Sequence, residues 1–330
     1  MTHKARKSAS KGAKTSSKEC VLAFDLGGTK LAAGIVDAGG KILEETRVPV
    51  SLELGKDAVL QQISDAGLAL LSGFPKVKKV GMASAGPLDA RTGTLLDPMN
   101  FTSTREGSWG KVPLASILKK RLKRPVWVEN DADAAILAEA WLGAARHQKD
   151  AMILTLGTGL GTGILVDGKL VQAGQGMHPE AGHLTLRIDD PEVLCGCGKR
   201  GCAEAFLSGK GFTERARKKL GQPKLQGEDV VKLAQQRNAQ ALQLFADYAH
   251  LLAMALHTYV MLYCPKVIIF AGSFAKASDF FLPKATAELY QLLCTRENWK
   301  NMMPKLEVSK LENRSGLLGA AYIALQGTTR

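Results

Sequence analysis

The chain has 330 residues, of which 45% are hydrophobic and 23% are charged, a balance typical of a globular protein long enough for two domains. No run approaches the roughly 20 apolar residues that a membrane span requires, so we expect no contact with a membrane. The cysteine content does not resemble the dense, paired framework of a small secreted protein. We therefore expect a cytoplasmic protein.

The formal net charge of +13 is unevenly distributed along the chain. Positions 1–18 contain no acidic residue and six basic ones, namely Lys4, Arg6, Lys7, Lys11, Lys14 and Lys18. This segment is rich in Ser, Thr, Ala and Gly, so it cannot bury enough apolar surface to fold alone, and we expect a disordered basic tail. Weak contact with polyanions and a transit peptide remain open, whereas a secretory signal is excluded because no apolar stretch follows the charges.

A meander of three strands is predicted directly after the tail. The apolar run 21–26 ends in Gly27-Gly28-Thr29-Lys30, the run 31–36 leads into a turn at 37–40, and alternation continues over 41–50. A nucleotide P-loop would instead place a helix after the first glycine turn. Helices and strands then alternate: helix 56–71, strand 77–83, helix 114–122, strand 126–129 and helix 132–142.

The same strand, glycine turn and strand return 130 positions later. Leu26-Gly27-Gly28-Thr29 corresponds to Leu156-Gly157-Thr158-Gly159, and the following turns at Asp37 and Asp167 keep the offset. Repetition at this distance predicts two similar domains, 19–135 and 136–330, with the last helix crossing back onto the first. The elements expected in the second half are strands at 151–156, 164–166, from 169 and at 266–271, and helices at 210–220, 227–238, 241–263 and 316–325.

The two glycine turns have the composition of phosphate-binding sites. Glycines let backbone N–H groups come close to an anion, as in Asp25-Leu-Gly-Gly-Thr-Lys30, where Asp25 is placed to hold Mg²⁺. A tight hairpin with an incidental acid is the alternative. Two such hairpins facing each other across a cleft would grip a triphosphate from both sides, which is the arrangement of the α/β actin-like ATPase (ribonuclease H-like) fold.

Asn130 and Asp131 stand side by side where a strand passes into a helix. Either residue could serve only as a helix cap, but one residue is enough for a cap. In a phosphoryl-transfer site, a carboxylate accepts the proton of the attacking hydroxyl while a neighbouring group orients the acceptor. The pair therefore predicts a catalytic position, with Asp131 as the base.

A cluster of one histidine and three cysteines is the most specific signal in the chain. His183, Cys195, Cys197 and Cys202 form a closed four-ligand set suited to structural zinc, with no open position for catalysis. The same spacing places Glu180 and Glu204 at the two ends of the metal loop, where solvated surface is the alternative for both. The remaining cysteines stand alone in apolar surroundings and are expected to be buried free thiols: Cys20, Cys264 and Cys294.

Together and in this order, these motifs resemble those of the ROK family of sugar kinases and sugar-responsive repressors. The resemblance runs from about Val21 to the C-terminus. It covers both phosphate motifs, the Asn130-Asp131 pair, the ExGH motif at Glu180–His183 and the CxCGxxGCxE motif at Cys195–Glu204. The family's glycine pair near the adenosine is only partly kept, as Gly272-Ser273.

The resemblance implies roles for individual residues. The sugar would be held by Asn130, Asp131, Glu180, His183 and Glu204. ATP would be bound by Gly27, Gly28, Thr29, Lys30, Gly157, Thr158, Gly159, Gly272 and Ser273, with Mg²⁺ near Asp25. In-line transfer to a hexose hydroxyl would then be catalysed by Asp131, while Mg²⁺ and the backbone N–H groups neutralise phosphate charge.

Several alternatives remain open at this point. A sugar-sensing repressor of the same family would need a DNA-reading domain, and only about twenty residues precede the first phosphate motif, so we expect no specific nucleic-acid partner. Among kinases, Gly86-Pro87-Leu88-Asp89 and the later Asn100 and Trp109 are similar to glucokinase members, and His178-Pro179 is similar to fructokinase members. Glucose is the first candidate, with fructose, mannose, N-acetylglucosamine and N-acetylmannosamine behind it. Polyphosphate could replace ATP, and the family resemblance implies a homo-oligomer, most simply a dimer.

Overall fold

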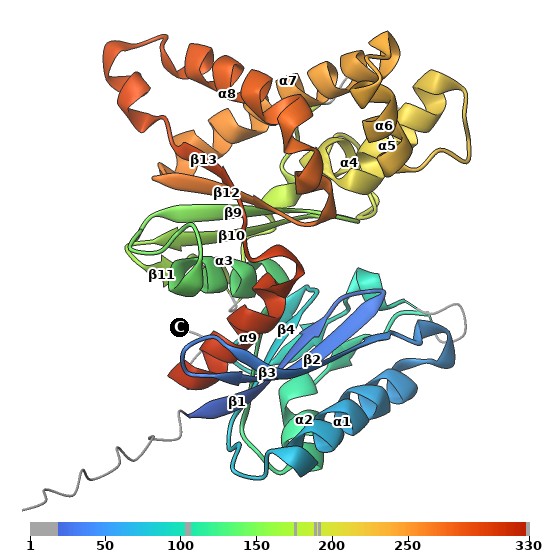
Figure 1. Cartoon of the computed structure of the whole chain (residues 1–330), viewed down its shortest axis with the longest axis vertical. Coiled ribbons are helices and arrows are strands. Elements are labelled where there is room, and N and C mark those ends of the chain that lie inside the picture. Colours follow the sequence, from blue (N-terminus) through green and yellow to red (C-terminus); the bar gives the residue numbers. More distant parts are fainter. Residues whose placement is uncertain (1–18, 103–106, 175–176, 188–189, 191–192, 328–330) are drawn as a thin grey trace, which may run out of the picture.

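The computed structural model describes residues 19–102, 107–174, 177–187, 190 and 193–327. The tail predicted for residues 1–18 lies outside these ranges. Two mixed five-stranded sheets stand one above the other, each with helices on its outer side, and two helices lie between them (Figure 1). The architecture is α/β, as the sequence predicts.

The first sheet has the order β3-β2-β1-β4-β8. An antiparallel meander of β1 (Cys20–Leu26), β2 (Lys30–Asp37) and β3 (Ile42–Pro49) is extended by β4 (Val80–Ser84) and β8 (Val126–Asn130), which run parallel to β1. Because side chains alternate along a strand, Leu22 and Phe24 pack against α1 (Lys56–Gly73) and α2 (Leu114–Leu122). Val21 and Ala23 pack on the opposite face, against α9 (Ser315–Gln326).

The second sheet repeats this plan in the order β11-β10-β9-β12-β13. Its antiparallel part consists of β9 (Ala151–Leu156), β10 (Leu160–Val166) and β11 (Lys169–Leu170), and β12 (Val267–Ala271) and β13 (Lys305–Val308) are parallel to β9. The 130-residue repeat in the sequence therefore corresponds to two sheets of the same topology. Helices α7 (Ala239–Tyr263) and α8 (Ser278–Leu293) cover the outer face.

Smaller elements complete each half. The first carries a three-stranded sheet of β5 (Leu88–Asp89), β6 (Thr94–Leu96) and β7 (Lys111–Val112). The second carries the helices α4 (Ala203–Leu207), α5 (Gly209–Leu220) and α6 (Gly227–Gln235). Within the described ranges, no helix is both long and apolar enough to span a bilayer.

Helices α3 (Asp131–Leu142) and α9 lie between the two sheets and pack against each other (Figure 1). Their approach depends on glycine, since a Cβ at Gly319 would overlap the carbonyl oxygen of Ala134. Helix α3 also packs on β9 and β10, with Ile136 and Ile153 in the same buried cluster. The boundary expected between residues 135 and 136 falls inside this helix, so no single residue there separates the two halves.

The isolated cysteines are not the buried thiols that the sequence suggested. Cys264 and Cys294 are exposed and Cys20 is half-buried. Cys264 and Cys294 occupy the C-cap positions of α7 and α8, where the chain turns away from the packed helix faces. Their apolar sequence neighbours belong to those faces, which made the thiols look buried. All six cysteines lie in the described ranges, and none forms a disulfide.

Candidate functional site

The two glycine turns are tight hairpins, and the second one borders a cavity. Gly27 N donates to Lys30 O at 3.0 Å, and Gly157 N donates to Gly159 O at 3.1 Å. The first turn packs on Asn100, whose carbonyl oxygen would lie 3.1 Å from a Cβ at Gly28. Asn100 also lines a cavity of about 670 Å³ together with residues of the second turn. This volume is in the range of small-molecule sites.

The cavity extends from the second hairpin along α5 and the cysteine-containing loop. Its lining includes Thr158, Gly159 and Glu204, which the sequence assigned to ATP and sugar. It also includes Asn100, noted in the sequence only for its likeness to glucokinases, and the α5 residues Lys210 and Arg215, to which the sequence gave no role. Two residues predicted to bind ATP and one predicted to bind sugar thus line one cavity, whereas the other residues predicted to bind ATP or sugar lie outside its lining.

Gly272 and Ser273 lie next to the second hairpin, at the end of β12. Gly272 has a φ of +90°, and a Cβ there would overlap the carbonyl oxygen of Leu156 at the end of β9. The start of α5 meets the same place, because Gly209 N donates to Gly157 O at 2.9 Å. Three chain segments therefore converge at the hairpin that starts at Gly157.

Asp25 and Asp131 form an electrostatically linked pair of carboxylates. Both keep partial contact with solvent. Burial raises the pKa of Asp25 to about 6 against an opposing effect of Arg47. Burial, and then the charges of Asp25 and, less strongly, Glu180, raise the pKa of Asp131 to about 7. A carboxylate with a pKa near neutrality is suited to exchange protons at physiological pH.

The end of β8 and the first turn of α3 hold Asp131 in place. Asn130 is the helix cap, because its Oδ1 accepts from Ala132 N at 2.8 Å and from Asp133 N at 3.2 Å. Asp131 Oδ1 also accepts from Ala132 N at 2.8 Å. Asn130 thus does serve as a helix cap, the alternative considered for this pair, and its position orients the neighbouring Asp131.

Two buried carboxylates flank this pair and were not identified from the sequence. Glu129 and Asp133 are each 1% exposed. Glu129 Oε1 accepts from Asn130 N at 2.9 Å, whereas Glu129 Oε2 and both oxygens of Asp133 have no hydrogen-bond partner among the described residues. Burial raises the pKa of Glu129 to about 7 and, with the charge of Glu129, raises that of Asp133 well above its ordinary range. No sequence signal separates such acids from solvated ones.

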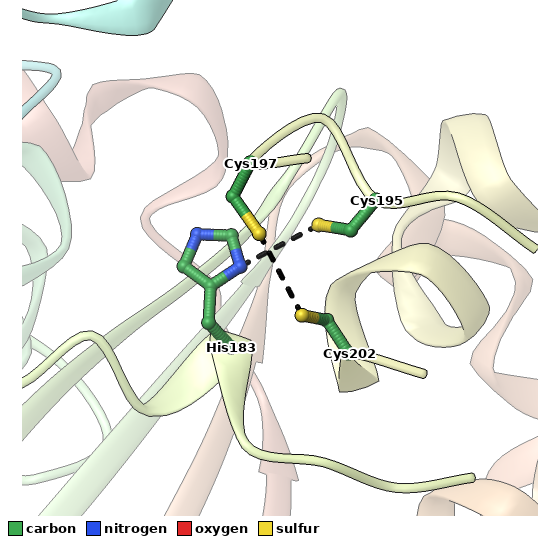
Figure 2. A group of neighbouring side chains, drawn as sticks. All are labelled: His183, Cys195, Cys197 and Cys202. Carbon is green, nitrogen blue, oxygen red and sulfur yellow. Dashed lines mark hydrogen bonds between the residues drawn. The ribbon is translucent and has the colours of Figure 1, made fainter. Parts of the chain in front are cut away.

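His183 and the three clustered cysteines converge as the sequence predicts (Figure 2). Their ligand atoms all lie within 4.8 Å of one another, with Cys195 Sγ 3.5 Å from His183 Nδ1 and Cys197 Sγ 3.7 Å from Cys202 Sγ. Two sulfurs about 2.3 Å from a tetrahedral zinc would be separated by about 3.8 Å. The donor set and its spacing fit such an ion, with His183 bound through Nδ1.

Glu204 lies between the histidine–cysteine cluster and the cavity, and Glu180 lies beside the cluster. Glu204 Oε2 accepts from Leu160 N at 3.1 Å, beside the second hairpin, and Cys195 Sγ donates to Glu204 Oε1 at 3.3 Å. Glu180 Oε2 lies 4.0 Å from His183 Nε2 on the other side of the cluster. Glu204 is therefore held beside the cluster by two hydrogen bonds, which favours a binding role over solvated surface, whereas the Glu180 side chain lies next to the cluster but is 42% exposed.

The N-terminus of α9 closes the site over Asp25. A Cβ at Gly316 would lie 2.5 Å from Asp25 Cγ, so only glycine allows this approach. Gly316 was predicted only as the start of the last helix. Its contact with Asp25 joins residues 291 positions apart, and local sequence carries no signal of it.

Known proteins resemble this chain over nearly its whole length. The model of the ROK family matches residues 21–327. A glucokinase from Thermotoga maritima is 30% identical, covering 92% of this chain and 96% of the relative. An N-acetyl-D-glucosamine kinase from Escherichia coli is 31% identical, covering 92% and 98%. The crystal structure of a ROK family glucokinase from Streptomyces griseus, in complex with glucose and AMPPNP, matches with a TM-score of 0.80 and 29% identity, covering 93% and 100%.

Proposed function

The chain belongs to the ROK family, and from this premise we propose that it is an ATP-dependent hexose kinase in which Asp131 is the general base. The observation that supports this role is the position of Asp131, on a capped helix start, with a pKa raised to about 7 by burial and by Asp25. In the proposed step, the Asp131 carboxylate takes the proton of a sugar hydroxyl. The hydroxyl oxygen then bonds to the γ-phosphorus of ATP as the bond to ADP breaks.

The two hairpins would hold the phosphates of ATP. Backbone N–H groups of Gly28 and Thr29 on one side, and of Thr158 and Gly159 on the other, are the proposed donors. Lys30 would add a charge, and Gly272-Ser273 would lie beside the nucleoside. The Asp25 carboxylate is a suitable oxygen ligand for Mg²⁺, directly or through water. When bound, Mg²⁺ would neutralise charge on the transferring phosphate.

The sugar would be bound by Asn130, Asp131, Glu180, His183 and Glu204. Carboxylate and imidazole groups form the paired hydrogen bonds that sugar hydroxyls require. His183 would face the sugar through Nε2, since its Nδ1 points to the three cysteine sulfurs (Figure 2). The neighbouring Glu180 and Glu204 supply acceptors on either side of the cluster.

The cluster of His183 with three cysteines is proposed to bind zinc with a structural role. Four protein ligands complete a tetrahedral shell, so no position remains open for a substrate. Zinc would fix the orientation of the His183 ring and the ends of the loop that carries Glu204. The ion would act on catalysis only through these side chains.

Glucose is the first substrate to test, because both the Thermotoga maritima and the Streptomyces griseus proteins are named glucokinases. N-acetylglucosamine is the second, because an Escherichia coli kinase for that sugar is equally similar. Mannose, fructose and N-acetylmannosamine complete the set. These sugars differ mainly at C1 and C2, so selection among them depends on the pocket around those carbons.

A coupled assay of ADP release with Mg-ATP and each sugar tests the proposal. We expect a strong sugar-dependent rate with at least one hexose. A folded, zinc-loaded protein that releases no ADP with any of the five sugars would contradict the kinase activity. Replacing ATP by polyphosphate in the same reaction, with direct detection of the sugar phosphate, tests the alternative donor.

A further inference from the structure

His178 is a buried histidine beside the sugar-binding residues, and it has no role in the proposed chemistry. Its side chain is 7% exposed. Its Nε2 lies 3.4 Å from Glu180 Oε1. We propose that His178 is a positioning residue for sugar binding, whose Nε2–H donates a hydrogen bond to Glu180 and fixes the carboxylate that contacts the sugar. This inference rests on the proposed hexose kinase activity.

The His178 ring lies between Glu180 and the region of Gly86 and Asn130. A Cβ at Gly86 would lie 3.3 Å from His178 Cε1 and 3.4 Å from Asn130 Nδ2, so Gly86 leaves the space in which both side chains fit. The Cε1 edge of the imidazole therefore faces Gly86, next to Asn130, and the adjacent Nε2 faces Glu180. His178 links the segment that carries Glu180 with the segment that carries the Asn130-Asp131 pair.

The protonation state of His178 follows from the partners of its two ring nitrogens. Nδ1 is buried and has no hydrogen-bond partner among the described residues. A proton on Nδ1 would be a buried, unsatisfied N–H, which costs free energy. A proton on Nε2, in contrast, lies on the nitrogen that is 3.4 Å from Glu180 Oε1. The neutral Nε2–H tautomer is therefore preferred, and burial also lowers the pKa of the ring against the opposing charge of Glu180.

The backbone on both sides of Glu180 is firmly anchored, so the side chain is the part that needs orientation. The buried Thr162 Oγ1 donates to Pro179 O at 3.3 Å, and the buried Tyr259 hydroxyl donates to Ala181 O at 2.9 Å. A Cβ at Gly182 would overlap the carbonyl oxygen of Leu160. The main chain thus sits close on β10 and α7. The Glu180 side chain, in contrast, is 42% exposed and faces open space.

Glu180 lies between two imidazoles, His178 at 3.4 Å and His183 at 4.0 Å. If His178 were removed, the more distant His183 ring, at 4.0 Å, would be the one neighbouring donor left to the Glu180 carboxylate among the described residues. Hydrogen bonds in an empty site are often long and tighten when the ligand binds. The effect of losing His178 should therefore appear mainly in sugar binding.

The test compares two substitutions that keep the size of the side chain but differ in the donor. His178→Gln retains an N–H group near the position of Nε2, and His178→Leu removes it. For each variant, KM for the sugar, KM for ATP and kcat are measured by ADP release. Sugar affinity is also measured by calorimetry without ATP, and thermal melting of the sugar-free protein controls for folding.

We expect His178→Leu to raise the sugar KM and the calorimetric Kd by about tenfold, the usual effect of a hydrogen bond to a charged group. KM for ATP should stay within about twofold, and His178→Gln should restore sugar affinity to within about threefold of the wild type. Equal effects of Leu and Gln, or an unchanged sugar KM in His178→Leu, would overturn the inference. A wild type that binds a hexose without phosphorylating it would contradict the proposed function alone, because the calorimetric comparison would still test His178.

Discussion

Replacing Asp131 by Asn should make the protein more stable at alkaline pH while it slows sugar phosphorylation. Burial and the nearby Asp25 raise the pKa of Asp131 from its ordinary value of 3.8 to about 7. In the unfolded chain the group ionises near pH 4, whereas in the folded protein it ionises only near pH 7. Its contribution to stability is therefore complete below pH 4 and is lost as the pH rises to about 7.

The size of the effect follows from the two pKa values. A change from 3.8 to about 7 corresponds to at most about 4 kcal/mol of unfolding free energy. Solvent reaches part of the side chain, so we expect a smaller loss, roughly 1–2 kcal/mol between pH 5.5 and pH 8.5. Asn cannot ionise and keeps an oxygen that can accept from Ala132 N, so the variant avoids this loss.

Urea unfolding at pH 5.5 and pH 8.5 measures the difference. The gain in stability of Asp131→Asn over the wild type should be larger at pH 8.5 by roughly 1–2 kcal/mol. Comparing two zinc-loaded proteins at each pH cancels the effect of pH on the metal site. Asp65→Asn, at an exposed position of α1, is the matched control and should show no such difference. An equal gain at both pH values would refute the assignment of a raised pKa to Asp131.

Three further predictions test other parts of the site. Asp133→Asn should raise the unfolding free energy at pH 8 by about 1–3 kcal/mol, because it removes a buried carboxylate that has no hydrogen-bond partner among the described residues. A lower unfolding free energy of the variant, measured by chemical denaturation, would contradict this. Chelation of zinc should lower the Tm by at least about 5 °C in the wild type, and a Cys197→Ser variant that kept the full response would exclude the cluster as the site. Gly316→Ala would place a methyl group 2.5 Å from Asp25 Cγ, so kcat/KM for ATP should fall at least about tenfold, whereas Gly73→Ala, which has open space, should leave it unchanged.

The elements that position the site could be predicted because their signals are local. The hairpins after Leu26 and Leu156 are marked by glycines, and the start of α3 is marked by the adjacent Asn130 and Asp131. Helix α8 was missed because Pro283 interrupts its pattern, although the helix continues through it. The strands of the small sheet, such as Leu88–Asp89, are too short to show periodicity.

The parts of the candidate site whose ligand chemistry restricts the residue type could be predicted from the sequence. The parts whose properties depend on burial were missed. Three cysteines beside a histidine predict a metal cluster, and the four side chains do converge. Glu129 and Asp133 look like ordinary acids in the sequence, and only the fold buries them. His178 was noted for its likeness to fructokinases, but its contact with Glu180 depends on the fold of the whole segment.

The central claim, that Asp131 is the base of a sugar kinase, is tested most directly by the rate of sugar phosphorylation in Asp131→Asn. The measurement is ADP release at saturating Mg-ATP and saturating concentration of the best hexose, with sugar binding checked by calorimetry. We predict that kcat falls by roughly 10²–10⁴, the contribution of a general base, while the variant still binds the sugar. A rate within about tenfold of the wild type would contradict the account.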